Sequence, residues 1–162
     1  LRQLIDNHQV QSYNSTTNYL CQIDQRWNDR RTKRIIWDIY TDRPNGSEVE
    51  YVCNDFGGNA NGEGQGLNRE HVMPRSWFGG SGTINSDLFN LLPVDIYVNS
   101  LRSNYAFANV RTVTRQTNNG CKIGWSEHNS NVRVFEPIDA YKGDVARIFF
   151  YLATRYENQI DD

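Results

Sequence analysis

The spacing of the apolar residues changes along this chain, and that change constrains the fold more than any other feature. Ile35–Tyr40 is a β-branched and aromatic run, and Leu67–Val72 alternates apolar with polar residues, as strands do. After Pro93 the apolar residues recur every three or four positions, which indicates a helix with one buried face. Strand-like patterns return at Val110–Arg115 and Asn131–Phe135, and a second helical pattern follows. The sequence therefore predicts an α+β fold.

Two segments carry the helical spacing. The first has a predicted buried face of Val94, Tyr97, Val98, Leu101 and Tyr105. The second follows Lys142-Gly143-Asp144 and is the strongest helical pattern of the chain, with Val145, Ile148, Phe149, Leu152 and Tyr156 on one face. On the polar face of the first helix, Asn99 and Arg102 are expected one turn apart and pointing the same way.

The remaining segments are predicted to be shorter elements and loops. A short helix is expected around Leu4 and Ile5, then a turn or strand at 10–13 and a helical tendency at 17–25. A second strand is expected at 48–53 and a turn at 118–120, while 54–66 and 76–85 are rich in loop-forming residues. No internal repeat or domain linker interrupts the pattern, so residues 1–162 are predicted to form one mixed domain.

Composition narrows the classes of function. Four Trp, nine Tyr and seven Phe supply an ordered core, and no apolar stretch reaches the roughly 18–20 residues of a membrane span. A net charge of −2 argues against holding nucleic acid by bulk electrostatics, although an enzyme with local phosphate contacts remains possible. The basic run at 30–34 is interpreted as a solvated loop. The start at Leu1, without Met or a signal-like segment, suggests a trimmed or processed form.

The chain has three cysteines, Cys21, Cys53 and Cys121. They are spaced too widely for a zinc knuckle or a CxxC redox pair. An odd number leaves at least one thiol free, so the sequence allows one disulfide or none.

The clearest chemical signal combines Glu70 and His71 with Asn99 and Arg102. A histidine near its reference pKa of about 6.5 is largely neutral at pH 7 and can take a proton from water. A carboxylate and an amide carbonyl are oxygen ligands suited to Mg²⁺ or Ca²⁺, and a guanidinium binds a phosphate in a two-pronged way. These groups are what a metal-assisted phosphodiester hydrolase needs.

Other interpretations of these residues stay open. Glu70 and His71 are adjacent, so in a regular strand they would face opposite sides, and a shared site requires the strand to end or twist there. A Glu-His pair and a polar helix face are also common on solvated surfaces. A zinc protease is excluded because neither H-E-x-x-H nor H-x-x-E-H occurs. His8 and His128 lack suitable companions and are interpreted as structural.

Several ordered segments resemble the bacterial endonuclease I family. They are residues 68–78, 86–88, 98–105 and 135–147 continuing to 153–156, together with the strand at 36–40. The resemblance implies an exported, sugar-nonspecific nuclease that cuts DNA, and often RNA, with little sequence preference and leaves 5′-phosphates. It also implies a ββα-metal (His-Me finger) core, in which a β-hairpin and a helix surround one Mg²⁺.

The resemblance further implies a role for individual residues. His71 would be the general base, Glu70 and Asn99 the metal ligands, and Arg102 a catalytic phosphate contact. Mg²⁺ is the expected cofactor, with Ca²⁺ or Mn²⁺ able to substitute. The expected partner is a DNA or RNA substrate, with no membrane and no obligate protein partner, and the protein is expected to be a secreted or periplasmic monomer.

Arg69 and Arg75, which flank the histidine, are weaker candidates for contacts to the phosphate backbone. Relatives also often carry a cysteine where this chain has Gly66-Leu67, so a disulfide from Cys53 across the 54–66 loop is not expected.

One departure from the family pattern supports an alternative. Relatives often place a histidine at the third or fourth position of the segment that reads Asp87-Leu88-Phe89-Asn90 here. The loss of that imidazole leaves open a catalytically impaired, nuclease-fold protein that only binds nucleic acid. A sequence-specific nuclease is less favoured, because no basic arm or second domain is visible.

Overall fold

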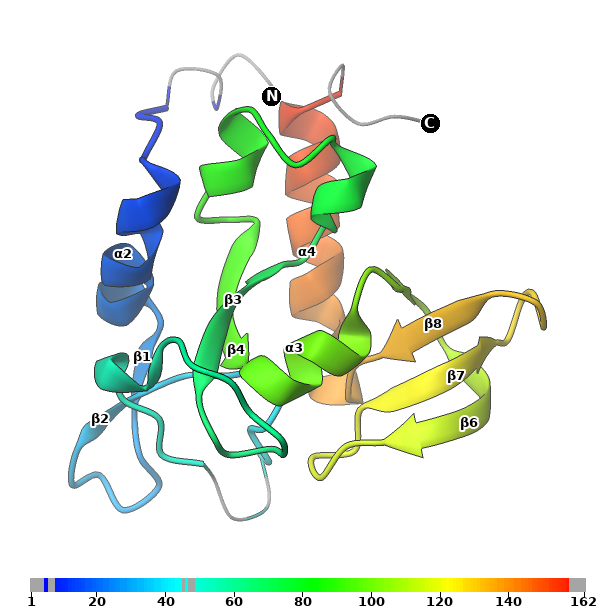
Figure 1. Cartoon of the computed structure of the whole chain (residues 1–162), viewed down its shortest axis with the longest axis horizontal. Helices are drawn as coiled ribbons and strands as arrows, with labels where there is room; N and C mark the ends of the chain where they lie inside the picture. The colour runs from blue at the N-terminus through cyan, green and yellow to red at the C-terminus, as the bar shows by residue number, and fades with distance from the viewer. Residues whose placement is uncertain (1–4, 6–7, 45, 47–48, 158–162) are drawn as a thin grey trace.

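The computed structural model describes residues 5, 8–44, 46 and 49–157, and it shows the expected mixed α+β fold (Figure 1). The helices are α2 (Thr16–Ile23), α3 (Ile96–Arg102) and α4 (Asp139–Arg155). Short 3-10 helices are η1 (Tyr13–Ser15), η2 (Cys53–Asp55), η3 (Arg75–Trp77) and η4 (Thr83–Ser86). No described helix combines the length and the apolar character needed to cross a membrane.

The strands form three sheets in the described part of the chain. They are β1 (Gln25–Trp27), β2 (Arg34–Ile36), β3 (Leu67–His71), β4 (Leu91–Asp95), β5 (Ala106–Phe107), β6 (Val110–Gln116), β7 (Lys122–Ser126) and β8 (Arg133–Glu136). β1 pairs with β2 and β3 with β4, both antiparallel. The third sheet has the order β5-β8-β7-β6, in which only the β5–β8 pair is parallel.

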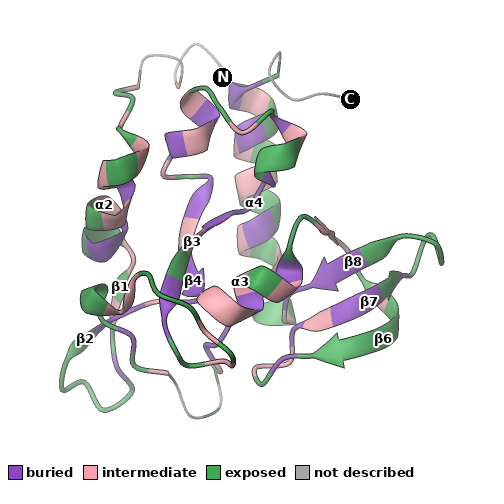
Figure 2. Ribbon diagram, in the orientation of Figure 1, coloured by how far each residue is buried: buried purple, intermediate pink, exposed green. Residues whose placement is uncertain are grey.

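The β3–β4 hairpin lies at the centre of the molecule. Figure 1 shows it between α2 on one side and the four-stranded sheet on the other, with α4 alongside and α3 across its end. Buried residues gather on β3 and β4, whereas β6 is exposed along most of its length (Figure 2). The main core joins α3, α4, β4, β7 and β8 through apolar side chains that include Val94, Val98, Ile123, Phe135 and Val145.

The start of α3 differs from the prediction. The expected helix began after Pro93, but that proline lies within β4, opposite Arg69. A strand with only one neighbour tolerates proline, because its outward-facing positions need no N–H donor. Asp95 then caps the helix, since its Oδ1 accepts the N–H of Val98 at 2.8 Å. Its Oδ2 accepts the Tyr51 hydroxyl at 2.5 Å, which fixes the turn between strand and helix.

Two other strand predictions were wrong, and one strand was missed. The strand predicted at 35–40 ends at Ile36, although Ile39 and Tyr40 are buried as expected. The described part of 48–53 forms no strand, and its link to β2 is the bond from the N–H of Ile36 to the carbonyl of Tyr51. β7 was not predicted. Its central Gly124 weakens the strand pattern, yet a Cβ there would collide with the carbonyl oxygen of Thr112 on β6.

The other predictions fared better. β3, β6 and α4 lie close to their predicted ranges, and 118–120 forms the expected turn. The helical tendency at 17–25 is α2, while 10–13 leads into a 3-10 helix and contains no strand. Leu4 lies outside the described residues.

A disulfide joins Cys21 on α2 to Cys53 on η2, so the question left open by the sequence is answered. The bond does not cross the 54–66 loop, which agrees with the expectation for that loop. Cys121 is a free, buried thiol in the core.

Asp24 gives a test of how burial affects stability. It caps the C-terminus of α2, and its Oδ2 is buried without a hydrogen-bond partner in the described structure. Burial raises the pKa of Asp24 to about 6, so ionisation favours the unfolded chain, where the pKa is lower. The contribution of this group to stability is therefore full below about pH 4 and is lost as the pH rises through 6.

We predict that Asp24→Asn stabilises the protein by about 1–2 kcal/mol at pH 8 and changes little at pH 4, the gain being limited by partial solvation of the carboxyl. Urea unfolding at both pH values measures the difference. Asp139→Asn is the control, because Asp139 is exposed and Lys142 lowers its pKa, so no gain is expected at pH 8. An equal effect of Asp24→Asn at the two pH values would contradict the prediction.

Candidate functional site

A cleft of about 410 Å³ lies where the end of β3 meets α3 and η3. It is lined by Arg69, Glu70, His71, Pro74, Arg75, Ser76, Asn99, Arg102, Ser103 and Asn104. Every side chain predicted from the sequence as a site residue therefore borders the same cleft. The segments 69–76 and 99–104 are far apart in sequence, and the packing of α3 on β3 brings them together.

Glu70 is almost fully buried, with 3% of its surface exposed. Its Oε1 accepts a hydrogen bond from the hydroxyl of Tyr40 at 2.6 Å and forms an ion pair with Nη1 of Arg102 at 2.9 Å. Its Oε2 has no such partner among the described residues. Burial raises the pKa of Glu70 to about 7, although Arg102 and Tyr40 act to lower it.

Arg102 faces inward, with 1% of its surface exposed. Besides binding Glu70, it donates from Nη1 to the carbonyl of His71 at 3.0 Å and from Nη2 to the carbonyl of Val72 at 2.6 Å. Its guanidinium carbon lies 4.5 Å from the centre of the Phe107 ring. This placement does not support the predicted phosphate contact, because both terminal nitrogens already donate to protein oxygens and only 1% of the residue's surface is exposed.

Arg102 also holds the end of β3, where Glu70 and His71 lie. The β3–β4 ladder ends at the pair His71 and Leu91, and Arg102 takes the carbonyls of the last strand residue and the one after it. β3 ends at His71, and Glu70 and His71 both border the cleft at this end of the strand.

The ring of His71 is held in one tautomer. Its Nε2 lies 2.9 Å from the carbonyl oxygen of Asn85, and a carbonyl can only accept, so Nε2 carries the proton and Nδ1 is an unprotonated acceptor. The pKa of His71 is lowered to about 4, chiefly by burial and also by the nearby charges of Arg75 and Arg69, although the bond to Asn85 acts to raise it. The imidazole is therefore neutral at pH 7.

Tyr13 is a site residue that sequence reasoning missed. Its ring stacks on His71 with 5.7 Å between the ring centres and 22° between the planes. The guanidinium of Arg69 lies over the Tyr13 ring, with its central carbon 3.9 Å from the ring centre. Arg69 also donates a hydrogen bond to the Tyr13 carbonyl at 2.5 Å. No local motif marks Tyr13, because it reaches the site from η1, far from β3 in sequence. Tyr40 was expected only as a core residue.

Asn99 lies half-buried on α3 and faces β3. Its Nδ2 donates to the carbonyl of Arg69 at 3.4 Å, which places the amide against the residue directly before Glu70. Its Oδ1 has no hydrogen-bond partner in the described structure. Glu70 Oε2 and Asn99 Oδ1 are thus oxygen atoms without a hydrogen-bond partner among the described residues, and each could act as a metal ligand. They come from two elements that pack together, and both residues border the cleft.

Of the two flanking arginines, Arg75 is the more exposed. It lies on η3 at the cleft and donates to the carbonyl of Gly80 at 3.0 Å. Arg69 is half-buried and engaged by Tyr13 and Thr16. Arg75 is therefore the better placed of the two to meet a ligand from solvent.

The segment that departs from the family pattern lies elsewhere. Phe89 is 66% exposed and packs on Tyr151, with 4.8 Å between the ring centres, and it does not line the cleft. Asn90 is fully buried and structural, since its Oδ1 accepts the N–H of Met73 and its Nδ2 donates to the carbonyl of Ile84.

Comparison with known proteins gives one family. A family model described as Endonuclease I matches residues 1–162. Proteins named extracellular ribonuclease from Bacillus subtilis (strain 168) and Bacillus amyloliquefaciens are 33% and 31% identical to this chain over 159 residues. Each match covers 97% of this chain and 48% of the relative, so the chain spans about half the length of these relatives.

The buried Arg102–Glu70 pair makes a prediction about stability. Arg102→Leu should cost about 3–5 kcal/mol at pH 8, because it leaves a buried carboxylate and two carbonyls without their donor. The cost should be smaller at pH 5, where Glu70 can take up a proton. Urea unfolding at the two pH values tests both parts.

Two further variants serve as a control and as a partial rescue. Arg30→Leu, at an exposed position, should change stability by less than about 0.5 kcal/mol. Glu70→Gln combined with Arg102→Leu should be more stable at pH 8 than Arg102→Leu alone. A loss below about 1 kcal/mol for Arg102→Leu would show that this side chain is free to leave the pair and reach a ligand.

Proposed function

Since the chain belongs to the endonuclease I family, we propose that it is a metal-dependent endonuclease that hydrolyses phosphodiester bonds in RNA and DNA with little sequence preference. The observation that carries the proposal is the cleft itself, which combines a neutral imidazole with two unpaired oxygen donors. The names of the two relatives support RNA as a substrate and secretion as the location.

The donor set fits Mg²⁺. Glu70 Oε2 and Asn99 Oδ1 are hard oxygen donors, and Mg²⁺ commonly keeps several waters and binds one or two protein oxygens. The described residues contain no group of three or more His, Cys, Asp and Glu side chains that could hold a metal, which argues against a zinc-type site. The order β3, β4, α3 supports a ββα-metal core around this pair. When bound, the cation would neutralise charge on the phosphate and on the departing 3′ oxygen.

His71 is the proposed general base. Its Nδ1 takes a proton from water, and the resulting hydroxide attacks phosphorus while the bond to the 3′ oxygen breaks; the departing 3′ oxygen then takes a proton from solvent water. The phosphate stays on the 5′ side of the product. The carbonyl of Asn85 and the stacked ring of Tyr13 hold the imidazole in the orientation that this transfer needs.

The arginines have different proposed roles. Arg102 is a positioning residue, which holds Glu70 and the end of β3 in place without touching the substrate. Arg75 contacts a phosphate from the cleft, and Arg69 supports Tyr13 and adds positive charge beside it. Such local contacts suit a chain with a net charge of −2, which must also release its product.

Water as the nucleophile makes the sugar unimportant for the chemistry. No 2′-hydroxyl takes part in the proposed step, so DNA and RNA can both be cut. The alternative of a binding protein without catalysis is less well supported, because Phe89 lies outside the cleft and its difference from histidine leaves the proposed base and ligands in place.

We predict that His71→Ala lowers cleavage of plasmid DNA and of RNA by at least about 100-fold, because no other group is placed to take the proton. His128→Ala is the matched control, since His128 is exposed and remote from the cleft, and its activity should equal that of wild type. Gel assays with Mg²⁺ and with EDTA measure both variants. A smear of products is expected, and cleavage retained by His71→Ala would end the assignment of the base.

A second prediction concerns pH and metal. Because the pKa of Glu70 is raised to about 7 by burial, protons compete with the cation below that value. The Mg²⁺ concentration for half-maximal rate should therefore rise as the pH falls from 7 to 5, by up to about tenfold per unit. Glu70→Gln should need at least about 10-fold more Mg²⁺ and should lose most of this pH dependence. A requirement for Mg²⁺ that stays constant across this range would contradict the ligand role of Glu70.

A further inference from the structure

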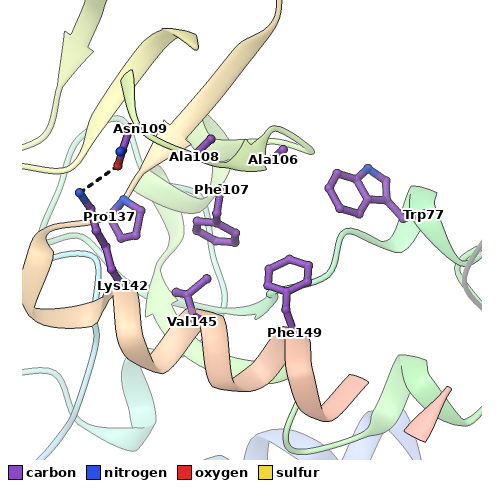
Figure 3. Close-up of a pocket in the computed structure, with 10 residues that line it drawn as sticks. Trp77, Ala106, Phe107, Ala108, Asn109, Pro137, Lys142, Val145 and Phe149 are labelled. Carbon is purple, nitrogen blue, oxygen red and sulfur yellow. Dashed lines mark hydrogen bonds between the residues drawn. The ribbon is translucent and has the colours of Figure 1, made fainter. Parts of the chain in front are cut away.

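A second hollow, of about 350 Å³, lies beside the cleft between β5, the residues that follow it and the first half of α4 (Figure 3). The side chains of Phe107, Phe149 and Trp77 gather around it, and Lys142 and Asn109 lie at its other end (Figure 3). Trp77 and Phe149 have ring centres 6.4 Å apart, and Phe107 meets Phe149 edge-on at 6.1 Å. We call this hollow the aromatic pocket.

The aromatic pocket and the cleft are bordered by neighbouring residues in two segments. On η3, Arg75 and Ser76 border the cleft and the next residue, Trp77, borders the pocket. After α3, Asn104 borders the cleft and Ala106 borders the pocket. Consecutive Cα atoms are about 3.8 Å apart, so the two hollows are separated by less than about 8 Å of chain at both places.

The chemistry of the pocket suits a flat, uncharged ring. Its cation, Lys142, is already paired with Glu136 and Asp139, each at 2.7 Å, so it is poorly suited to bind a phosphate. The Oδ1 of Asn109 accepts from Lys142 at 3.2 Å, which leaves a polar edge beside an otherwise apolar wall. Aromatic walls bind nucleobases by stacking, whatever the base, since every base has a π-face.

We propose that the aromatic pocket binds one nucleobase of the substrate, next to the phosphate in the cleft, and so favours single-stranded nucleic acid. This inference rests on the proposed nuclease function. A base in a duplex is paired and stacked, so it can enter only after it is flipped out, which costs free energy. A base in a single strand enters freely. The pocket thus selects by strandedness and not by sequence or sugar.

The test compares cleavage of one oligonucleotide sequence as a single strand and as a duplex. A labelled oligonucleotide is cut either alone or in a duplex, by wild type and by Trp77→Leu. We expect Trp77→Leu to raise KM for the single strand roughly 5- to 150-fold, the range for losing one stacked base, with KM for the duplex unchanged. Trp125→Leu is the matched control, because Trp125 lies on β7 away from both hollows, and it should change neither value.

A second pair of variants guards against a local folding defect at η3. Phe149→Leu should act like Trp77→Leu, whereas its neighbour Phe150 is 73% exposed on the same helix and Phe150→Leu should have no effect. Melting temperatures check that each variant folds. An unchanged single-strand KM, or equal losses on both substrates, would overturn the base-binding role.

A binding measurement separates this inference from the proposed activity. Adenosine and cytidine, which carry no phosphate, are titrated into the protein in EDTA while indole N–H signals are followed by NMR. The signal absent from Trp77→Leu identifies Trp77, and we expect it to shift on titration. If the Trp77 signal shifts but the protein cuts no nucleic acid, the nuclease proposal alone is wrong. If the protein is an active nuclease but the Trp77 signal does not shift, the base-binding role of the pocket alone is wrong.

Discussion

The buried guanidinium of Arg102 is the interaction on which the cleft depends. It joins the last turn of α3 to the end of β3 by binding the Glu70 carboxylate and the carbonyls of His71 and Val72. A buried cation is costly unless it is paired and hydrogen-bonded, so this geometry is stable only while all of these partners are in place. These contacts lie where β3 ends, and the adjacent Glu70 and His71 both border the cleft there.

Burial acts on both titratable groups of the cleft by favouring the neutral form, with opposite chemical results. It lowers the pKa of His71 to about 4, which keeps the imidazole ready to accept a proton at neutral pH. It raises the pKa of Glu70 to about 7, so this carboxyl is only partly ionised there without a cation. In our proposal Glu70 Oε2, which Arg102 does not contact, would help to hold a cation, and His71 is neutral until it takes the proton.

The two hollows divide the recognition of a nucleotide between them. The cleft holds charged and polar groups suited to a phosphate, whereas the aromatic pocket holds rings and a lysine whose charge is already paired. Their separation is short because η3 and the segment after α3 border both. Phe107 links them physically, since it lines the pocket and lies under the guanidinium of Arg102.

The sequence by itself predicted the α+β class, the approximate ranges of β3 and α4, and Glu70, His71 and Asn99 as candidate residues of one site, because periodicity and short motifs are local properties of the chain. Only the tertiary structure decided that the polar face of α3 turns inward against β3. Arg102 is buried for this reason and links α3 to β3. Periodicity shows which side chains share a helix face, but packing decides whether that face meets solvent or protein. Tyr13 entered the site for the same reason: its contact with the imidazole joins η1 to β3, and no local pattern encodes a contact over such a distance in sequence.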